Sequence, residues 1–147
     1  MNILSLLAFF AGAAIAIQAA LNANLSHQIS SALLATCIAF ICSFVCISII
    51  TITFTRNYPS LDTIASVPKY LWLSGGVLSA VGVSLFYFLI PKMGIAAMMS
   101  IALCGQLMTA SFIGHFGFFE QPAKPFDVTK FVGLIALITG ILLINRE

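Results

Sequence analysis

Five long apolar runs, separated by short polar stretches, constrain this chain more than any other feature. An α-helix needs about 20 consecutive apolar residues to cross the hydrocarbon core of a bilayer. The five runs come close to that length, and we expect membrane-spanning helices at about residues 3–21, 32–54, 70–90, 94–112 and 128–144. The sequence therefore predicts an all-α integral membrane protein with one transmembrane domain over residues 1–147.

The small number of charged side chains supports the same class. Only 7% of the residues are charged and 61% are hydrophobic, whereas a soluble domain carries roughly 25% charged residues. The chain therefore needs the lipid bilayer as its partner. Its six basic residues are scattered, whereas nucleic-acid binding requires clustered lysine and arginine, so no nucleic-acid partner is expected.

The first and the last run each have an alternative interpretation. Residues 14–16 resemble the small-residue cleavage site of a signal peptide, but no lysine or arginine precedes the first run, so a retained helix is favoured. The last run is the shortest and could lie on the membrane surface. It lacks the polar stripe of a surface helix, which favours a fifth span.

The distribution of positive charge gives a weak prediction of orientation. With five spans, the basic side chains divide into four on one face of the membrane and two on the other: Arg56, Lys69, Lys124 and Lys130 against Lys92 and Arg146. The positive-inside rule then places the N-terminus in the cytoplasm. Because a bias of four to two is small, we expect dual topology. Two inverted copies of such a unit would form a common transporter architecture, in which the substrate site lies between the repeats.

Glycines recur within the apolar runs. Membrane helices associate through small residues that let their backbones approach closely. We expect six glycines to serve helix packing: Gly12, Gly75, Gly76, Gly105, Gly133 and Gly140.

Amide side chains inside the apolar runs are the main candidates for a functional site. Burying an unpaired polar group costs about 1–3 kcal/mol, and an amide offers donors and an acceptor to a ligand or to another helix. Gln18 and Asn22 are four residues apart, so a helix places them on one face, and Gln106 lies in the fourth run. We expect these three residues to line a substrate pathway, or else to bond between helices. Asn22 has a third interpretation, as a cap at the helix end.

His115, at the end of the fourth run, is the fourth candidate for the pathway. No Asp or Glu lies within any run, and the one Lys or Arg is Lys130 near the start of the last run, although proton-coupled carriers often use an intramembrane carboxylate. His115 is thus the one side chain near a span that would titrate near neutral pH. The alternative is an interfacial role beside Phe116.

Other side chains suggest no chemistry. The aromatic residues Phe10, Trp72, Phe86, Tyr87 and Phe88 are expected to be mostly lipid-facing or interfacial anchors, with one or two lining a pocket. The cysteines have no His or carboxylate near them in sequence, so we interpret them as reduced packing residues rather than a metal site. No nucleophile–base pair or phosphate loop is present, so neither an enzyme nor a cofactor is predicted.

Two glutamine-bearing motifs resemble those of the YdcZ-type branch of the drug/metabolite transporter (DMT) superfamily. They are residues 17–25 (IQAALNANL) and residues 104–107 (CGQL), the latter followed by HFG at residues 115–117. Residues 72–76 and 91–94 also match in type and spacing.

This resemblance implies a five-span half-transporter, which is half of a ten-helix inverted-repeat fold. It would pair with a second copy or with a close relative. The branch's recurring positions fall on Gln18, Asn22, Gly105, Gln106, His115 and Gly117. Where the branch typically has Asp before its HFG motif, this chain has Gly114, so no role of that carboxylate carries over.

Together these features predict a carrier in the bacterial inner membrane. Its substrate would be a small organic molecule, a metabolite or a drug-like compound, neutral or weakly charged because no fixed charge lies deep inside the spans to offset an ionic one. Transport would proceed by alternating access in an antiparallel dimer. The alternative is a non-transporting accessory or assembly subunit of a larger membrane complex.

Overall fold

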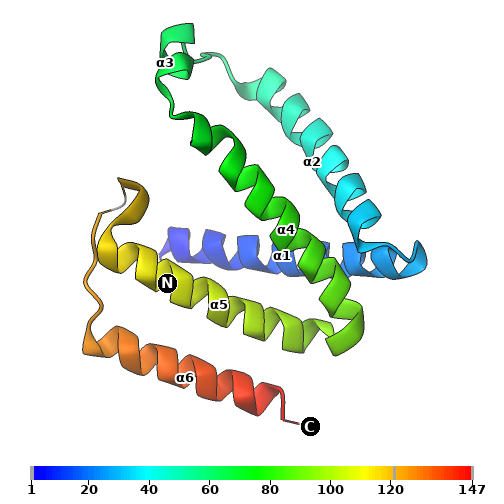
Figure 1. Ribbon diagram of the computed structural model, residues 1–147, viewed down its shortest axis with the longest axis vertical. Helices are drawn as coiled ribbons and strands as arrows, with labels where there is room; N and C mark the ends of the chain where they lie inside the picture. The colour runs from blue at the N-terminus through cyan, green and yellow to red at the C-terminus, as the bar shows by residue number, and fades with distance from the viewer. Residues whose placement is uncertain (1, 121, 147) are drawn as a thin grey trace. The chain divides into compact units, whose positions relative to one another are not determined.

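Helices and their short connections make up the computed structural model, which describes residues 2–120 and 122–146 (Figure 1). The elements are α1 (Ile3–Gln28), α2 (Ala32–Phe54), α3 (Leu61–Ser66), α4 (Lys69–Met93), α5 (Ile95–Phe116), the 3-10 helix η1 (Phe118–Glu120) and α6 (Val128–Ile144). Helices α1, α2, α4 and α5 are each long and apolar enough to cross a membrane, and α6 is a shorter apolar helix of 17 residues. The predicted all-α membrane class is confirmed.

Helices α2 and α6 begin and end at the predicted residues, whereas α1 continues beyond its predicted end. Residues 22–28 contain no glycine or proline, so nothing breaks the helix before Gln28. It ends where Ser30 adopts a φ of 54°. The interpretation of Asn22 as a helix cap is therefore wrong, because Asn22 lies more than a turn inside α1.

The predicted fourth span is also too short at its C-terminal end. Helix α5 continues to Phe116, and the residue after it, Gly117, adopts the left-handed conformation common after helices. His115 therefore lies in the last turn of a helix. A further difference concerns residues 55–69, the polar stretch between the second and third predicted spans. It contains α3, whose first turn is capped by Ser60 Oγ, which accepts from the Thr63 N–H at 3.2 Å.

The chain divides into two compact units, Met1–Lys92 and Met93–Glu147. Close to this boundary, Gly94 is the one residue between α4 and α5. Its φ of 82° lies in the region that favours glycine.

In the first unit, α1 and α2 form a helical hairpin that packs through small side chains. The buried residues of α1 are Ala19, Ala23 and Ser26, and those of α2 are Ala35, Thr36 and Ala39. Tyr87 of α4 packs against Ala35 and Ala39 and is 1% exposed. Because lipid is as apolar as leucine, this contact depends on close approach rather than on removing apolar surface from water.

We expect Ala23→Leu to separate α1 from α2. Ala23 is 2% exposed, and overpacking a tight contact costs about 1–3 kcal/mol. The measurement is energy transfer between labels on α1 and α2 during a titration with sodium dodecyl sulfate, which should be lost at a lower detergent fraction. Ala14→Leu, at an exposed position of the same helix, is the control. Equal midpoints for the two variants would contradict this packing.

In the second unit, α5 and α6 run side by side (Figure 1). Asn145, the residue that ends α6, donates from Nδ2 to Ser100 Oγ of α5 at 3.0 Å and to the Ile141 carbonyl at 2.9 Å. Met98 of α5 is buried. A polar contact thus joins the C-terminal end of α6 to the N-terminal part of α5.

The glycines expected to serve packing face open space within their own units. A Cβ atom placed on Gly12, Gly75, Gly76, Gly105, Gly133 or Gly140 would meet no other atom of the same unit within 4 Å. Their packing role stays a prediction, and it concerns contacts outside the unit to which each belongs.

Candidate functional site

A hydrogen bond between two helices places Gln18 in the first unit. Its Nε2 donates to the hydroxyl oxygen of Tyr87, which joins the middle of α1 to the C-terminal half of α4. A tyrosine buried in an apolar setting usually finds a partner for its hydroxyl, and here the partner is an amide from 69 residues earlier.

Asn22 lies one turn further along α1 on the same face. Its Nδ2 donates to the backbone carbonyl of Gln18 at 3.0 Å. The predicted shared face of Gln18 and Asn22 is thus present, and the Gln18 amide joins it to Tyr87.

A second polar contact lies one turn earlier on α4. Ser84 Oγ donates to Thr36 Oγ1 of α2 at 3.1 Å, and Thr36 Oγ1 donates to the Ala32 carbonyl at 2.8 Å. We call Gln18, Asn22, Thr36, Ser84 and Tyr87 the polar seam. It joins α1, α2 and α4 through neutral groups alone.

An apolar groove of about 450 Å³ adjoins the polar seam. Its lining comes from the start of α2 and the middle of α4: Ala32, Leu33, Ala80, Val81, Ser84, Leu85 and Phe88. Ser84 belongs to both the seam and the groove, and it gives the groove its one side-chain hydroxyl. The combination of apolar walls with few polar groups is typical of small-molecule sites.

Gln106 lies in the second unit, on an exposed face of α5. Among the described residues its side-chain amide has no hydrogen-bonding partner, unlike that of Gln18. The two glutamines belong to different units, so the contacts within each unit do not bring them together.

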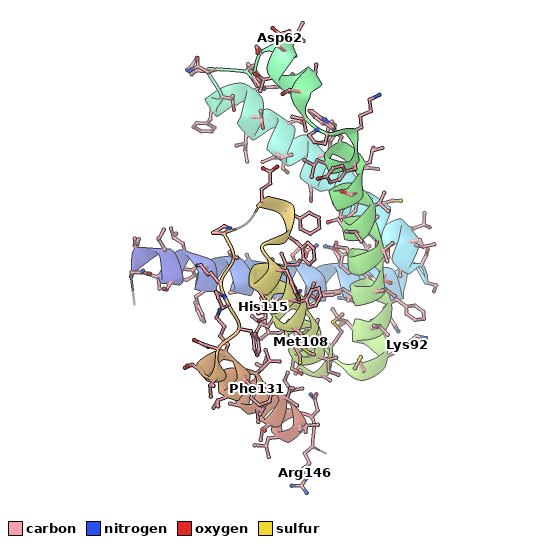
Figure 2. All side chains as sticks on the ribbon, turned by 60° about the vertical axis from the view of Figure 1, so that its left-hand side comes forward. Asp62, Lys92, Met108, His115, Phe131 and Arg146 are labelled. Atoms are coloured by element: carbon pink, nitrogen blue, oxygen red, sulfur yellow. The ribbon has the colours of Figure 1, made fainter. Side chains whose placement is uncertain are left out.

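His115, in the last turn of α5, binds the connection to α6 (Figure 2). Its Nδ1 accepts the backbone N–H of Phe126 at 2.9 Å, and its ring meets that of Phe116 edge-on, with centroids 4.8 Å apart. Next to it is a cavity of about 250 Å³ between α5, α6 and this connection, lined by Met108, Ser111, Phe112, His115, Phe126 and Leu134.

The sequence did not identify Tyr87 as a site residue. Among the aromatic residues expected to face lipid, Phe10, Trp72 and Phe88 are 60%, 58% and 48% exposed, whereas Tyr87 is 1% exposed. The available signal was its hydroxyl, since a tyrosine deep in an apolar run needs a polar partner. No local pattern in the sequence indicates that Gln18 is this partner.

Four long apolar helices, three of which are joined by a neutral polar seam, define a multi-pass membrane protein. The chain belongs to the DMT_YdcZ family, whose model is described as "Putative inner membrane exporter, YdcZ" and matches residues 3–143. The resemblance seen in the two glutamine motifs is thereby confirmed. The family is one of inner-membrane transporters and not of enzymes. No curated protein and no solved structure matches the chain significantly.

Proposed function

We propose that this protein exports a small, neutral or weakly charged organic molecule by alternating access. The observation that supports this most is the hydrogen bond between Gln18 and Tyr87 in the polar seam, which adjoins the apolar groove. It holds an amide inside the membrane at a place where a passing substrate would exchange hydrogen bonds with it. Gln106, whose amide is unoccupied within its own unit, would supply the second contact, with Asn22 and His115 further along the pathway.

The charge of the substrate is inferred from the charges in the helices. In α4 the charged residues are Lys69 at the start and Lys92 in the last turn, and in α6 the charged residue is Lys130 in the first turn. The polar seam carries no formal charge. A fixed ionic substrate would have no opposite charge inside the membrane and would pay a large desolvation cost.

The proposed assembly is an antiparallel pair, of two copies or of this chain and a close relative. Most large apolar side chains of α1, α2 and α4 are exposed in the single chain, which leaves much surface for lipid and for a partner. A weak charge bias supports insertion in both orientations, and an inverted pair has the symmetry of many carriers.

The test is substrate flux in proteoliposomes that contain a pH-sensitive dye, challenged with a panel of neutral metabolites and organic cations. We expect Gln18→Ala and Gln106→Ala each to lower flux about tenfold, as expected when a hydrogen bond worth roughly 1.4 kcal/mol is lost in the rate-limiting state. Gln28→Ala is the matched control, because Gln28 lies in the last turn of α1, where its Nε2 donates to Asn24 at 3.3 Å. Flux that neither pathway variant changes would contradict the proposed pathway. Silence of the wild type, together with stable co-purification of another membrane protein, would favour the accessory subunit.

A further inference from the structure

Hydrogen bonds to α5 and α6 hold residues 122–127 in place within the second unit. The backbone N–H of Phe126 donates to His115 Nδ1 at 2.9 Å, and the backbone N–H of Lys124 donates to the Gly114 carbonyl at 2.7 Å. From α6, Lys130 Nζ donates to the Pro125 carbonyl at 2.8 Å. The first two contacts fall on neighbouring residues at the end of α5, so the segment is fixed at that helix end.

The contact at His115 depends on the charge of the imidazole. Neutral imidazole has one acceptor nitrogen, whereas both nitrogens of the imidazolium are donors. Protonation of Nδ1 would therefore set two donors, this nitrogen and the Phe126 N–H, against each other. Histidine is the side chain that ordinarily changes charge between pH 5 and 8, so docking of the segment is favoured as the pH rises.

The elements around His115 carry charges of both signs. Two carboxylates are present, Glu120 in η1 and Asp127 at the start of α6, and Asp127 Oδ1 already accepts the Lys130 N–H at 2.8 Å. The cations are Lys124 of the segment and Lys130 of α6, which would repel an imidazolium. Helix α5 itself carries no other charged side chain.

We propose that protonation of His115 releases Phe126 from the end of α5 and opens the cavity next to it, while the Lys124 N–H stays bonded to the Gly114 carbonyl. Phe126 is part of the cavity wall, together with Met108 and Leu134. When the hydrogen bond from the Phe126 N–H to His115 is lost, this part of the cavity wall is no longer fixed to α5. We call this contact between His115 and Phe126 the latch. It is closed when His115 is neutral and open when His115 is protonated.

The state of the latch can be measured at a single backbone amide, that of Phe126, in the whole chain. Pro125–Phe126 is the only Pro-Phe pair in the sequence, so labelling proline with ¹³C at the carbonyl and phenylalanine with ¹⁵N gives a single correlated signal, that of the Phe126 amide. Hydrogen exchange of this amide in nanodiscs is compared with the intrinsic rate at each pH. We expect protection at pH 8 to fall about tenfold at pH 5, as for the loss of one hydrogen bond.

Substitutions of the two histidines separate the latch from a general effect of acid. His115→Asn keeps a side-chain acceptor near the position of Nδ1 but does not titrate, so its protection should be the same at both pH values. His115→Ala should be unprotected at both. His27→Asn, at the exposed end of α1, should behave as wild type and also leaves His115 as the single imidazole, whose ¹⁵N shifts should move at the same pH as the Phe126 signal. Equal protection of the wild type at pH 5 and 8, or a loss on acidification that persists in His115→Asn, would overturn the proposal.

Discussion

Replacing Tyr87 with alanine is expected to destabilise the first unit more than any other single truncation in it. Tyr87 is the largest fully buried side chain among the described residues. Its ring fills the space against Ala35 and Ala39, and its hydroxyl holds Gln18. Truncating a large buried ring costs roughly 3 kcal/mol because of the cavity that it leaves. The measurement is energy transfer between labels on α1 and α4 as dodecyl sulfate is added, whose midpoint should fall.

Two matched variants divide this effect into its parts. Tyr87→Phe keeps the ring and removes the hydroxyl, so it should cost about 0.6 kcal/mol and at most about 1.7 kcal/mol, the range for hydrogen bonds between membrane helices. Tyr70→Ala removes a ring of the same kind from an exposed position of the same helix, where 58% of the residue is accessible. A midpoint for Tyr87→Ala no lower than that for Tyr70→Ala would show that α4 is not held to α1 through this residue.

The second large effect is expected from moving positive charge across the membrane. If all five apolar helices cross, Arg56 and Lys124 lie on the face with four basic residues and the end of α1 lies on the other. A variant with Arg56→Ser, Lys124→Ser, His27→Lys and Gln28→Lys reverses the bias from four against two to two against four. The positive-inside rule then predicts that insertion shifts toward an external N-terminus, while lysines at the end of α1 suit the helix dipole.

Orientation is measured by labelling a single cysteine with a membrane-impermeant reagent. The cysteine replaces Ser60 in a background without the four native cysteines, and it is probed in intact and inverted vesicles. The wild type should be labelled from both sides and the reversed variant predominantly from one. A second variant, Lys92→Ser with Arg146→Ser, keeps four basic residues on one face and none on the other. It should be labelled predominantly from the side opposite to that of the reversed variant. A wild type labelled from one side alone would argue against dual topology.

The sequence predicted helices well where apolar runs have clear limits. Helix α2 lies between the N-cap Ser31, whose side chain accepts from the Leu34 N–H, and the extended residue Thr55, and both limits are visible as changes in polarity. Helix α1 was predicted too short because Asn22 and Asn24 interrupt the apolar pattern without breaking the backbone. Polarity marks the edge of the hydrocarbon core, whereas helix ends depend on backbone breakers and caps.

The candidate site was less accessible to sequence reasoning. The shared face of Gln18 and Asn22 follows from helix geometry alone. Their contact with Tyr87 depends on how α4 crosses α1, which no local pattern encodes. The environment of Gln106 is equally undetermined by sequence, since any partner for its amide lies beyond its own unit. His115 was found by its chemistry, but its contact with Phe126 requires the fold of the connection between α5 and α6.

The polar contacts between helices have a consequence for how this chain comes apart. Within the described residues the side-chain hydrogen bonds that join different apolar helices, or the residue that follows one, are few: Gln18 to Tyr87, Ser84 to Thr36 and Asn145 to Ser100. Each helix satisfies its own backbone and would persist in lipid without its neighbours. Dissociation of the helices should therefore leave far-ultraviolet circular dichroism almost unchanged. A spectrum of full helicity would then be compatible with helices inserted in the membrane, but it would not show whether these helices are packed against one another.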